Sequence, residues 1–303
     1  MSNPSQTTHP ADSPLGVSLA TAAFLVWGLS PVYWKSLASV PAFEILMHRM
    51  IWSFVFLAPL VLLSGHWDDL RQALTSARKL LILTGTTLIV GFNWFLFIWA
   101  INSGHILQTS LGYYMTPLVN VMLGVVFLKE RLRRLQLLAV GLAAVGVGYL
   151  TLSYGLFPWV SLALAFSFGF YGLIRKVAPV SALVGLTVET LLLSIPATGY
   201  LVYLGHAGRG AFLNAGPSIT LLLMGTALMT GLPLLLFTMG TKLLRLATVG
   251  FLQYIAPSCT FLLAVFIYRE PLMPAQLLTF GLIWAALAIY SYDSLMTYKS
   301  PGN

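Results

Sequence analysis

Long apolar blocks, separated by short polar or basic segments, run along the whole chain. Each block spans about 20 residues, the length at which an α-helix crosses a hydrocarbon layer of about 30 Å. Because lipid offers the backbone no hydrogen-bond partners, blocks of this length and uniformity are expected to be helices. The pattern predicts ten membrane-spanning helices, at Leu15–Trp34, Pro41–Ser64, Leu80–Ile101, Ile106–Leu128, Leu135–Leu152, Leu156–Ile174, Ala182–Leu204, Ile219–Thr241, Ala247–Tyr268 and Pro274–Tyr292.

The low content of charged residues strengthens this prediction. Hydrophobic residues make up 58% of the 303 positions and charged residues only 8%, whereas a soluble domain carries about 25% charged residues. So few charges cannot cover a water-exposed surface, and an all-α integral membrane protein is expected. Its predicted parts are a disordered cytoplasmic tail (1–14), a five-helix repeat (15–153), a second, inverted five-helix repeat (154–293) and another cytoplasmic tail (294–303).

The basic residues predict how the chain is oriented. A net charge of +8 would suggest a nucleic-acid partner for a soluble protein, but here the basic residues lie mostly in short loops, where they report topology. With a cytoplasmic N-terminus, only Lys35, Arg209 and Arg269 fall in external loops, while Arg49 falls within a span. The other twelve fall inside: Arg71, Arg78, Lys79, Lys129, Arg131, Arg133, Arg134, Arg175, Lys176, Lys242, Arg245 and Lys299. This bias predicts that both termini are cytoplasmic.

A stretch of the first half recurs in the second half at a constant offset of 140 residues. The matches include Gly85 with Gly225, Thr86 with Thr226, Phe97 with Phe237, Tyr114 with Tyr254, Pro117 with Pro257, and Lys129-Glu130 with Arg269-Glu270. Each predicted repeat contains five helices, so the second copy must cross the membrane in the opposite direction. Inverted repeats are the usual basis of alternating access in transporters. The architecture therefore favours a transporter over an enzyme or a receptor.

Several segments also resemble a known family, the EamA-type drug/metabolite transporters. The repeated Pro117…Lys129-Glu130 and Pro257…Arg269-Glu270 patterns carry the broad resemblance. Resemblance to the RarD or "chloramphenicol-sensitive" group rests on the segments 44–49 (EILMHR), 51–54 (IWSF), 93–100 (NWFLFIWA), 110–113 (SLGY), 165–168 (AFSF) and 170–173 (FYGL). This resemblance implies a multi-pass permease or exporter of small metabolites or drugs in a bacterial-type inner membrane. It supplies no catalytic or binding signature to transfer.

Ionisable residues inside predicted spans are candidates for coupling or substrate binding, because an unpaired charge in hydrocarbon costs several kcal/mol. Glu44 and His48 are four residues apart and share a helix face, where they can exchange protons near neutral pH. Alternatively, Glu44 is an interfacial residue stabilised by the helix dipole in the first turn after Pro41. Arg49 points away from Glu44 and is either functional or paired with a carboxylate on a neighbouring helix. Glu189 is the approximate repeat partner of Glu44.

Amides and aromatic residues in the spans form a second group of candidates. Amides in a span must find partners, and aromatic rings suit aromatic or amphipathic substrates. The same rings also form membrane-interface belts or pack in the core, so both interpretations stay open. The candidates for a substrate cavity are Asn93, Trp94, Trp99, Tyr113, Tyr114, Asn120, Tyr171, Gln253 and Tyr254.

Proline and small residues predict how the helices bend and pack. Pro117 and Pro257 remove backbone hydrogen bonds and are candidate hinges. The Lys129-Glu130 and Arg269-Glu270 pairs at helix ends indicate topology and loop anchoring, with a gating salt bridge as the alternative. Gly141, Gly281 and the series Ser161, Ala165 and Gly169 predict close helix contacts.

The sequence also argues against several kinds of function. It has no GxxxxGK phosphate loop followed by Ser or Thr, no HExxH motif, and a single cysteine, Cys259, in an apolar block. We therefore expect no metal or cofactor and no enzymatic activity. The expected partners are a small-molecule substrate and the lipid bilayer, not nucleic acid. The leading hypothesis is a secondary transporter that exports its substrate, with a proton gradient as the candidate energy source. The alternatives are an uncoupled facilitator or importer, and an intramembrane enzyme or sensor.

Overall fold

The computed structural model describes residues 12–103, 105–155, 157–269 and 274–299 and is all-helical in those ranges. Ten of its helical stretches are long and apolar enough to span a membrane, as the sequence predicts. The helices are α1 (Pro14–Lys35), α2 (Ala42–Leu63), α3 (Trp67–Thr75), α4 (Ala77–Asn102), α5 (Ile106–Leu128), α6 (Arg134–Tyr154), α7 (Trp159–Val177), α8 (Ala182–His206), α9 (Pro217–Leu243), α10 (Leu246–Gln253), α11 (Ile255–Leu262), a π-helical turn (Leu263–Ile267) and α12 (Pro274–Lys299). The last helix therefore continues into the predicted tail 294–303.

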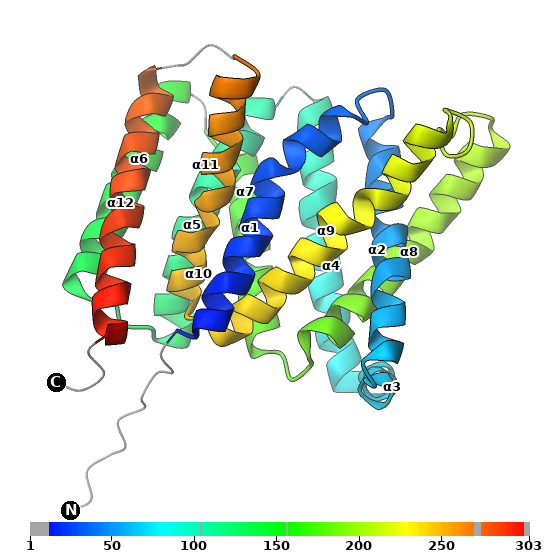
Figure 1. The fold of residues 1–303 in the computed structure, drawn as a ribbon, viewed down its shortest axis with the longest axis horizontal. Helices are drawn as coiled ribbons and strands as arrows, with labels where there is room; N and C mark the ends of the chain where they lie inside the picture. The colour runs from blue at the N-terminus through cyan, green and yellow to red at the C-terminus, as the bar shows by residue number, and fades with distance from the viewer. Residues whose placement is uncertain (1–11, 104, 156, 270–273, 300–303) are drawn as a thin grey trace, which may run out of the picture.

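The bundle has two ends, which the chain reaches alternately (Figure 1). The end at which α1 begins and α12 ends is called the terminal side here, and the other end the opposite side. The terminal side also carries α3, a nine-residue helix that the sequence analysis did not predict. Its first turn contains Asp68 and Asp69, which favour a helix N-terminus, and only Ala73 is buried.

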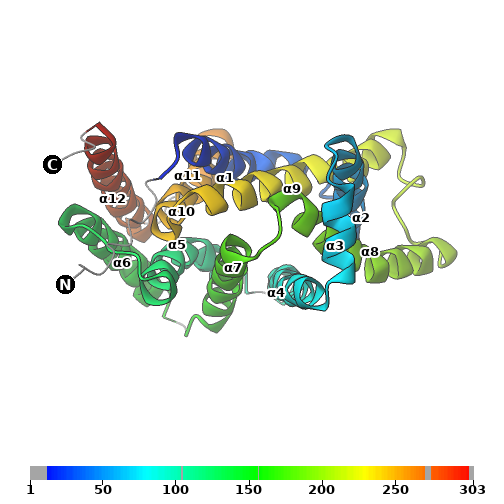
Figure 2. The same cartoon turned by 90° about the horizontal axis from the view of Figure 1, so that it is seen from below.

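The helices of the two halves pack against one another in a paired pattern. In the sequence repeat, α1 corresponds to α7, α2 to α8, α4 to α9, α5 to α10 and α11, and α6 to α12. Helix α1 packs against α9, and α7 packs against α4; likewise α1 contacts α10 and α11, and α7 contacts α5. The pairs α2 with α8 and α6 with α12 complete the bundle, at the two ends of its long axis (Figure 2). The inverted duplication itself stays a prediction.

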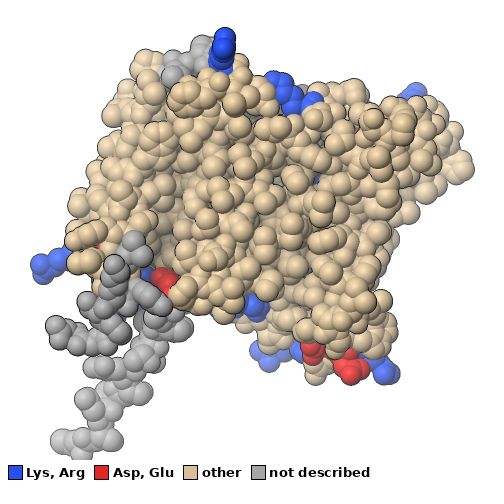
Figure 3. All heavy atoms as spheres, viewed as in Figure 1, with Lys and Arg blue, Asp and Glu red and all other residues tan. Residues whose placement is uncertain are grey.

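Apolar residues occupy both the core and the outer surface between the two ends. The central core contains Phe24, Tyr171 and Phe237, and a second core lies between α5, α6, α10 and α12. Large apolar side chains such as Leu152 and Phe266 are exposed on the outside. On the face shown in Figure 3, the charged side chains gather at the two ends and leave a broad uncharged band between them. This distribution is that of a membrane-embedded protein.

Small residues mediate helix contacts in one of the two predicted places. Ser161, Ala165 and Gly169 are buried on α7, and a Cβ atom added at Gly169 would lie 2.8 Å from Val119 of α5. For Gly141 and Gly281 the prediction of close contacts is wrong, because a Cβ atom at either position would meet no atom within 4 Å. These two glycines are on outward-facing surfaces of α6 and α12.

The two repeated prolines have different surroundings. Helix α5 continues through Pro117, and its carbonyl oxygen lies against α10, where a Cβ atom at Gly250 would approach it to 2.6 Å. The corresponding span of the second half is divided: α10 ends at Gln253, α11 begins at Ile255 and contains Pro257, and the helix becomes π-helical after Leu262. The missing N–H of a proline favours such a break in its preceding turn. The role of either proline as a hinge stays a prediction.

Candidate functional site

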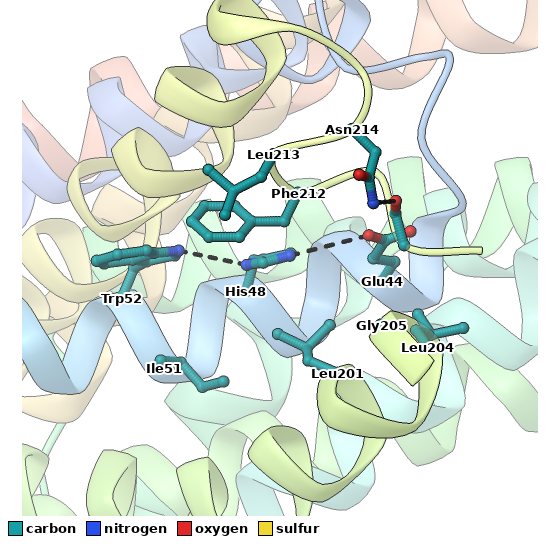
Figure 4. Close-up of a pocket in the computed structure, with 11 residues that line it drawn as sticks. Glu44, His48, Ile51, Trp52, Leu201, Leu204, Gly205, Phe212, Leu213 and Asn214 are labelled. Atoms are coloured by element: carbon teal, nitrogen blue, oxygen red, sulfur yellow. Dashed lines mark hydrogen bonds and ion pairs between the residues drawn. The ribbon is translucent and has the colours of Figure 1, made fainter. Parts of the chain in front are cut away.

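A pocket at the opposite side brings the first turns of α2 together with the end of α8 and the loop that follows it. Its volume is about 370 Å³. Figure 4 shows how the side chains are arranged around it. The lining residues are Glu44, His48, Ile51, Trp52, Leu201, Leu204, Gly205, Gly210, Phe212, Leu213 and Asn214. Glu44 and His48 are therefore polar groups in a largely apolar pocket.

Glu44 connects the beginning of α2 to the loop between α8 and α9. Pro41 precedes the helix and Glu44 lies in its first turn, where an acid is favourable. Yet Glu44 is only 1% exposed. Its Oε1 accepts a 2.6 Å hydrogen bond from the backbone N–H of Ala211, whereas Oε2 has no hydrogen-bond partner in the part of the chain that the structure describes. The carboxylate thus anchors a loop and still has one oxygen available.

His48 lies one turn further along α2, on the same face as Glu44. The indole Nε1 of Trp52 donates a hydrogen bond of 3.3 Å to its Nδ1, so in the neutral imidazole Nε2 carries the proton. Nε2 is 3.9 Å from Glu44 Oε1 and makes no hydrogen bond to any described residue. The ring of Phe212 lies over the imidazole at a centroid distance of 5.1 Å. Trp52 and Phe212 were not among the predicted residues, although Trp52 is found by repeating the four-residue spacing from His48.

Arg49 lies next to His48 in sequence but points towards other helices. Its Nε donates a 2.8 Å hydrogen bond to Thr230 Oγ1 of α9. The rings of Trp34 and Trp94 lie 5.0 and 5.4 Å from the guanidinium carbon, and Tyr113 is close enough to interact electrostatically. Within the described ranges, no carboxylate lies within 4.0 Å of Arg49. The expected pairing with an acid on a neighbouring helix is therefore not found among the described residues, and a functional role of Arg49 stays a prediction.

Glu189 belongs to a separate, sealed cluster nearer the terminal side. Its Oε1 lies 3.5 Å from Arg175 Nε and accepts a 2.5 Å hydrogen bond from Thr86, while Tyr171 donates a 3.0 Å hydrogen bond to Oε2. Arg175 also donates to the carbonyl oxygens of Ser181 and Ala182. Glu189 is 1% and Arg175 0% exposed. The cluster joins α4, α7 and α8.

The predicted amides bond across helices. Asn93 of α4 donates to the Leu164 carbonyl and the Ser167 hydroxyl of α7, at 3.0 and 2.8 Å. Asn120 of α5 donates a 2.7 Å hydrogen bond to Gln253 of α10. All three amides are more than nine-tenths buried. These contacts join helices of the first half to helices of the second half.

The predicted aromatic residues fall into different environments. Tyr114 and Tyr254 are buried in the core between α5, α10 and α12. Trp99 is 37% exposed and stacks on His105 beside Trp159 at the opposite side, as in an interfacial aromatic belt. Tyr113 is 50% exposed and packs edge-on against Phe97. Only Trp94 and Tyr113 from this group lie beside Arg49.

Side chains at the terminal side hold the helix ends together. The buried carboxylate of Glu130 accepts hydrogen bonds of 2.6 and 2.9 Å from the N–H groups of Leu246 and Ala247, which begin α10. Lys129 and Arg269 both have left-handed backbone, with φ of 57° and 53°. Glu130 therefore acts as the loop anchor that the sequence predicted, bonded to backbone rather than to a basic side chain. Glu270 lies outside the described residues.

Further ion pairs and hydrogen bonds connect the helix ends at the terminal side. Arg245 forms a 3.1 Å ion pair with Asp12. Lys176 donates to the carbonyl oxygens of Thr241 and Leu244, and Lys242 donates to that of Ala178 at 2.9 Å. Among the described residues, His, Cys, Asp and Glu side chains form no group of three that could hold a metal ion.

Comparison with known proteins identifies the family to which the chain belongs. Residues 14–152 match the EamA-like transporter family. The chain is 46% identical to "Protein RarD" of Salmonella typhimurium over 284 residues, which cover 94% of this chain and 97% of that protein. It is 34% identical to the "Chloramphenicol-sensitive protein RarD" of Pseudomonas aeruginosa, over 92% and 94% of the two chains.

A solved crystal structure has the same fold, with a TM-score of 0.70 at 18% identity, covering 92% of this chain and 98% of the other. The helical architecture is thus shared beyond recognisable sequence similarity. The match of 284 residues extends over both halves of the bundle. The chain belongs to the EamA-like transporter family and is a multi-pass membrane transporter related to the RarD proteins.

Proposed function

We propose that the protein is a secondary transporter that exports small organic molecules by alternating access, with proton binding at Glu44 and His48 providing the coupling. One observation carries this proposal: Glu44 Oε2 and His48 Nε2 are buried atoms of a membrane-spanning helix that have no hydrogen-bond partner among the described residues, and both side chains line a pocket. Buried polar atoms without partners are costly, and they mark functional positions in membrane helices.

A carboxylate beside an imidazole is suited to proton exchange. Adding a proton to the pair changes its charge by one, and removing the proton restores a carboxylate that has only the Ala211 N–H as a hydrogen-bond donor. Within the pocket lining, Glu44 and His48 are the titratable side chains; α8 contributes Leu201 and Leu204, and the loop contributes Phe212 and Leu213. The charge of the pocket therefore depends on these two groups. Binding of a substrate in the pocket is thereby linked to protonation of Glu44 and His48.

The two ends of the bundle support alternating access. At the terminal side Glu130, Lys176, Lys242 and Arg245 connect helix ends, whereas the pocket lies at the opposite side. We assign the terminal side to the cytoplasm from the distribution of basic residues. In this assignment the structure represents a state whose cytoplasmic contacts are assembled. Export requires that they separate as the opposite side closes.

The test is uptake of a labelled panel into proteoliposomes, with and without an imposed pH gradient. The panel includes chloramphenicol, because one relative carries its name, and aromatic amino acids. Gradient-driven accumulation of one compound is the expected result, and exchange without accumulation would instead indicate an uncoupled facilitator. Chemical conversion of a compound without its movement would contradict transport.

Substitutions test the coupling site separately. Glu44→Gln and His48→Gln, each alone, should abolish accumulation driven by the pH gradient but preserve exchange of labelled for unlabelled substrate. Asp69→Asn and His66→Gln are matched controls, because both residues lie in or before α3 and away from the pocket. If uphill transport survives both substitutions in α2, the coupling site lies elsewhere.

A further inference from the structure

Arg49 holds a positive charge within a spanning helix, and no acidic side chain of the described chain compensates it. It is seven residues from the first residue of α2, which corresponds to a depth of about 10 Å along the helix. The described acidic residues have other positions: Asp12 pairs with Arg245, Glu130 binds the start of α10, Glu189 pairs with Arg175, Asp293 pairs with Arg133, Glu44 binds Ala211, and Asp68 and Asp69 begin α3.

Packing fixes the orientation of the guanidinium. Helices α2 and α9 approach closely where a Cβ atom at Gly231 would lie 3.3 Å from Ser53, and the adjacent Thr230 accepts the hydrogen bond from Arg49 Nε. Trp34 is itself held by a 3.0 Å hydrogen bond from its indole N–H to Ser30. The cation is thus preorganised between an indole from α1 and one from α4.

The two terminal nitrogens of Arg49 are available for a ligand. Within the described residues neither has a hydrogen-bond partner, and neither belongs to the buried polar atoms sealed from water. Tyr113 of α5 is half exposed and interacts electrostatically with the guanidinium. The arrangement is a fork of N–H donors between aromatic surfaces, with a phenol nearby as a further donor.

We propose that Arg49 binds the carboxylate of the transported compound, a small organic anion with an aromatic or apolar body. Aromatic faces attract the guanidinium but leave its net charge in place, so the site still requires an anion in a low-dielectric environment. A guanidinium binds a carboxylate through two parallel hydrogen bonds, a geometry that lysine cannot reproduce. The rings of Trp34, Trp94 and Tyr113 provide surfaces for a flat apolar body.

Identification of the bound anion as a substrate rests on the proposed transport function, whereas anion binding at Arg49 does not. The direct experiment therefore measures binding to the purified full-length protein in detergent, by isothermal calorimetry and tryptophan fluorescence. Three probes share one phenyl ring and one three-carbon chain: 3-phenylpropionate, 3-phenylpropionamide and 3-phenylpropylamine. We expect the acid to bind and the amide and amine to bind at least about tenfold more weakly.

Three variants assign the interaction to Arg49. Arg49→Gln should abolish binding of 3-phenylpropionate, and Arg49→Lys should weaken it by about tenfold, because the charge remains but the fork is lost. Arg209→Gln, which removes a cation from the exposed loop before the pocket, should leave it unchanged. Thermal unfolding gives a second measurement: without an anion, Arg49→Gln should unfold at the same or a higher temperature than the wild type, because an uncompensated cation is removed.

The outcomes separate this inference from the transport proposal. Equal binding of the acid and the amide, or unchanged binding to Arg49→Gln, overturns the anion site even if neutral compounds are transported. A marked fall in unfolding temperature for Arg49→Gln together with no effect on binding would show that Arg49 is a structural clamp. Binding of the acid that depends on Arg49, with no movement of any labelled acid into proteoliposomes, would leave the site established and the transport proposal refuted.

Discussion

Glu44 and Glu189 lie at roughly corresponding positions of the two halves, 145 residues apart, and each is only 1% exposed. Their partners differ. Glu189 has a cation, a hydroxyl and a phenol around its two oxygens. Glu44 has one backbone N–H and a histidine 3.9 Å away, with one oxygen unpartnered. The same residue type is therefore a fully engaged structural element in one half and an incompletely engaged group facing a pocket in the other.

This difference shows why burial and charge alone do not identify a functional residue in a membrane helix. A buried carboxylate whose two oxygens both accept hydrogen bonds, as in Glu189, holds a particular arrangement of helices, and removing its charge leaves the neighbouring cation uncompensated. A buried carboxylate with an unused oxygen is instead ready to bind a proton or a ligand. Both regions contain buried atoms without a hydrogen-bond partner among the described residues, but in one the atom is a carboxylate oxygen of a pocket-lining residue and in the other it belongs to the Arg175 guanidinium.

The largest expected effect comes from removing the charge of Glu189. In Glu189→Gln the amide can still bond Thr86 and Tyr171, but Arg175 becomes an unpaired buried cation. We expect a loss of about 3–5 kcal/mol in the free energy of unfolding. The measurement is reversible unfolding of the purified protein in mixed micelles, followed by circular dichroism.

Two further variants define the control for that prediction. Glu189→Gln combined with Arg175→Gln should recover most of the lost stability, because no buried charge remains. Glu44→Gln should cost no more than about 1 kcal/mol, since it removes no ion pair of comparable quality. Equal losses for Glu44→Gln and Glu189→Gln would mean that the two carboxylates are structurally equivalent after all.

A smaller effect is expected from the anchor at the terminal side. Glu130→Ala leaves the N–H groups of Leu246 and Ala247 at the start of α10 without their acceptor. The expected cost is about 2 kcal/mol in the free energy of unfolding, between the loss of a helix cap and that of two buried hydrogen bonds. Thermal unfolding in detergent measures it.

Asp69→Ala is the matched control for this anchor, because Asp69 also lies near a helix N-terminus but is exposed. Its effect should stay within about 0.5 kcal/mol. Glu130→Gln keeps one acceptor oxygen, so its loss in the free energy of unfolding should lie between those of Glu130→Ala and Asp69→Ala. If Glu130→Ala is as stable as the wild type, the cap at α10 does not hold the terminal side together.

The fold was predictable because hydrophobic length is a direct physical requirement of the bilayer. The ten spans follow from apolar blocks such as 219–241, and only their ends shift, for instance to Pro217–Leu243 in α9. Helix α3 was missed because it is short and polar, with a single buried residue, so no apolar block indicates it. Gly141 and Gly281 were misassigned because a small residue in a span indicates close packing only when another helix lies opposite it.

The candidate site was predictable only where its residues share one helix. The proximity of Glu44 and His48 follows from their four-residue spacing, and Trp52 continues the same series. The partners of Arg49 and Glu189 come from other helices. Thr230 lies 181 residues from Arg49, and Thr86 lies 103 residues from Glu189. A sequence without known tertiary contacts does not specify which hydroxyl meets which charge.

The smallest expected change in stability comes from a substitution of Trp52. This substitution tests the pocket that contains Glu44 and His48 most specifically. Trp52→Phe keeps an aromatic ring near Phe212 and removes the N–H that donates to His48 Nδ1. The loss of one hydrogen bond should cost about 1 kcal/mol of stability. Without that donor, the imidazole is no longer restricted to the tautomer whose proton faces Glu44. Accumulation driven by the pH gradient should therefore fall several-fold relative to substrate exchange, measured in the same proteoliposomes.

Trp284→Phe provides the comparison for that experiment, since Trp284 donates a hydrogen bond of similar length, 2.9 Å, to Ser258 far from the pocket. A structural role for indole donors in general would make the two variants alike in both stability and transport. A coupling role for His48 requires that they differ in the ratio of accumulation to exchange while their stabilities remain similar. Identical ratios would show that the orientation of His48 has no part in coupling, and that the two unpartnered atoms of α2 serve binding alone.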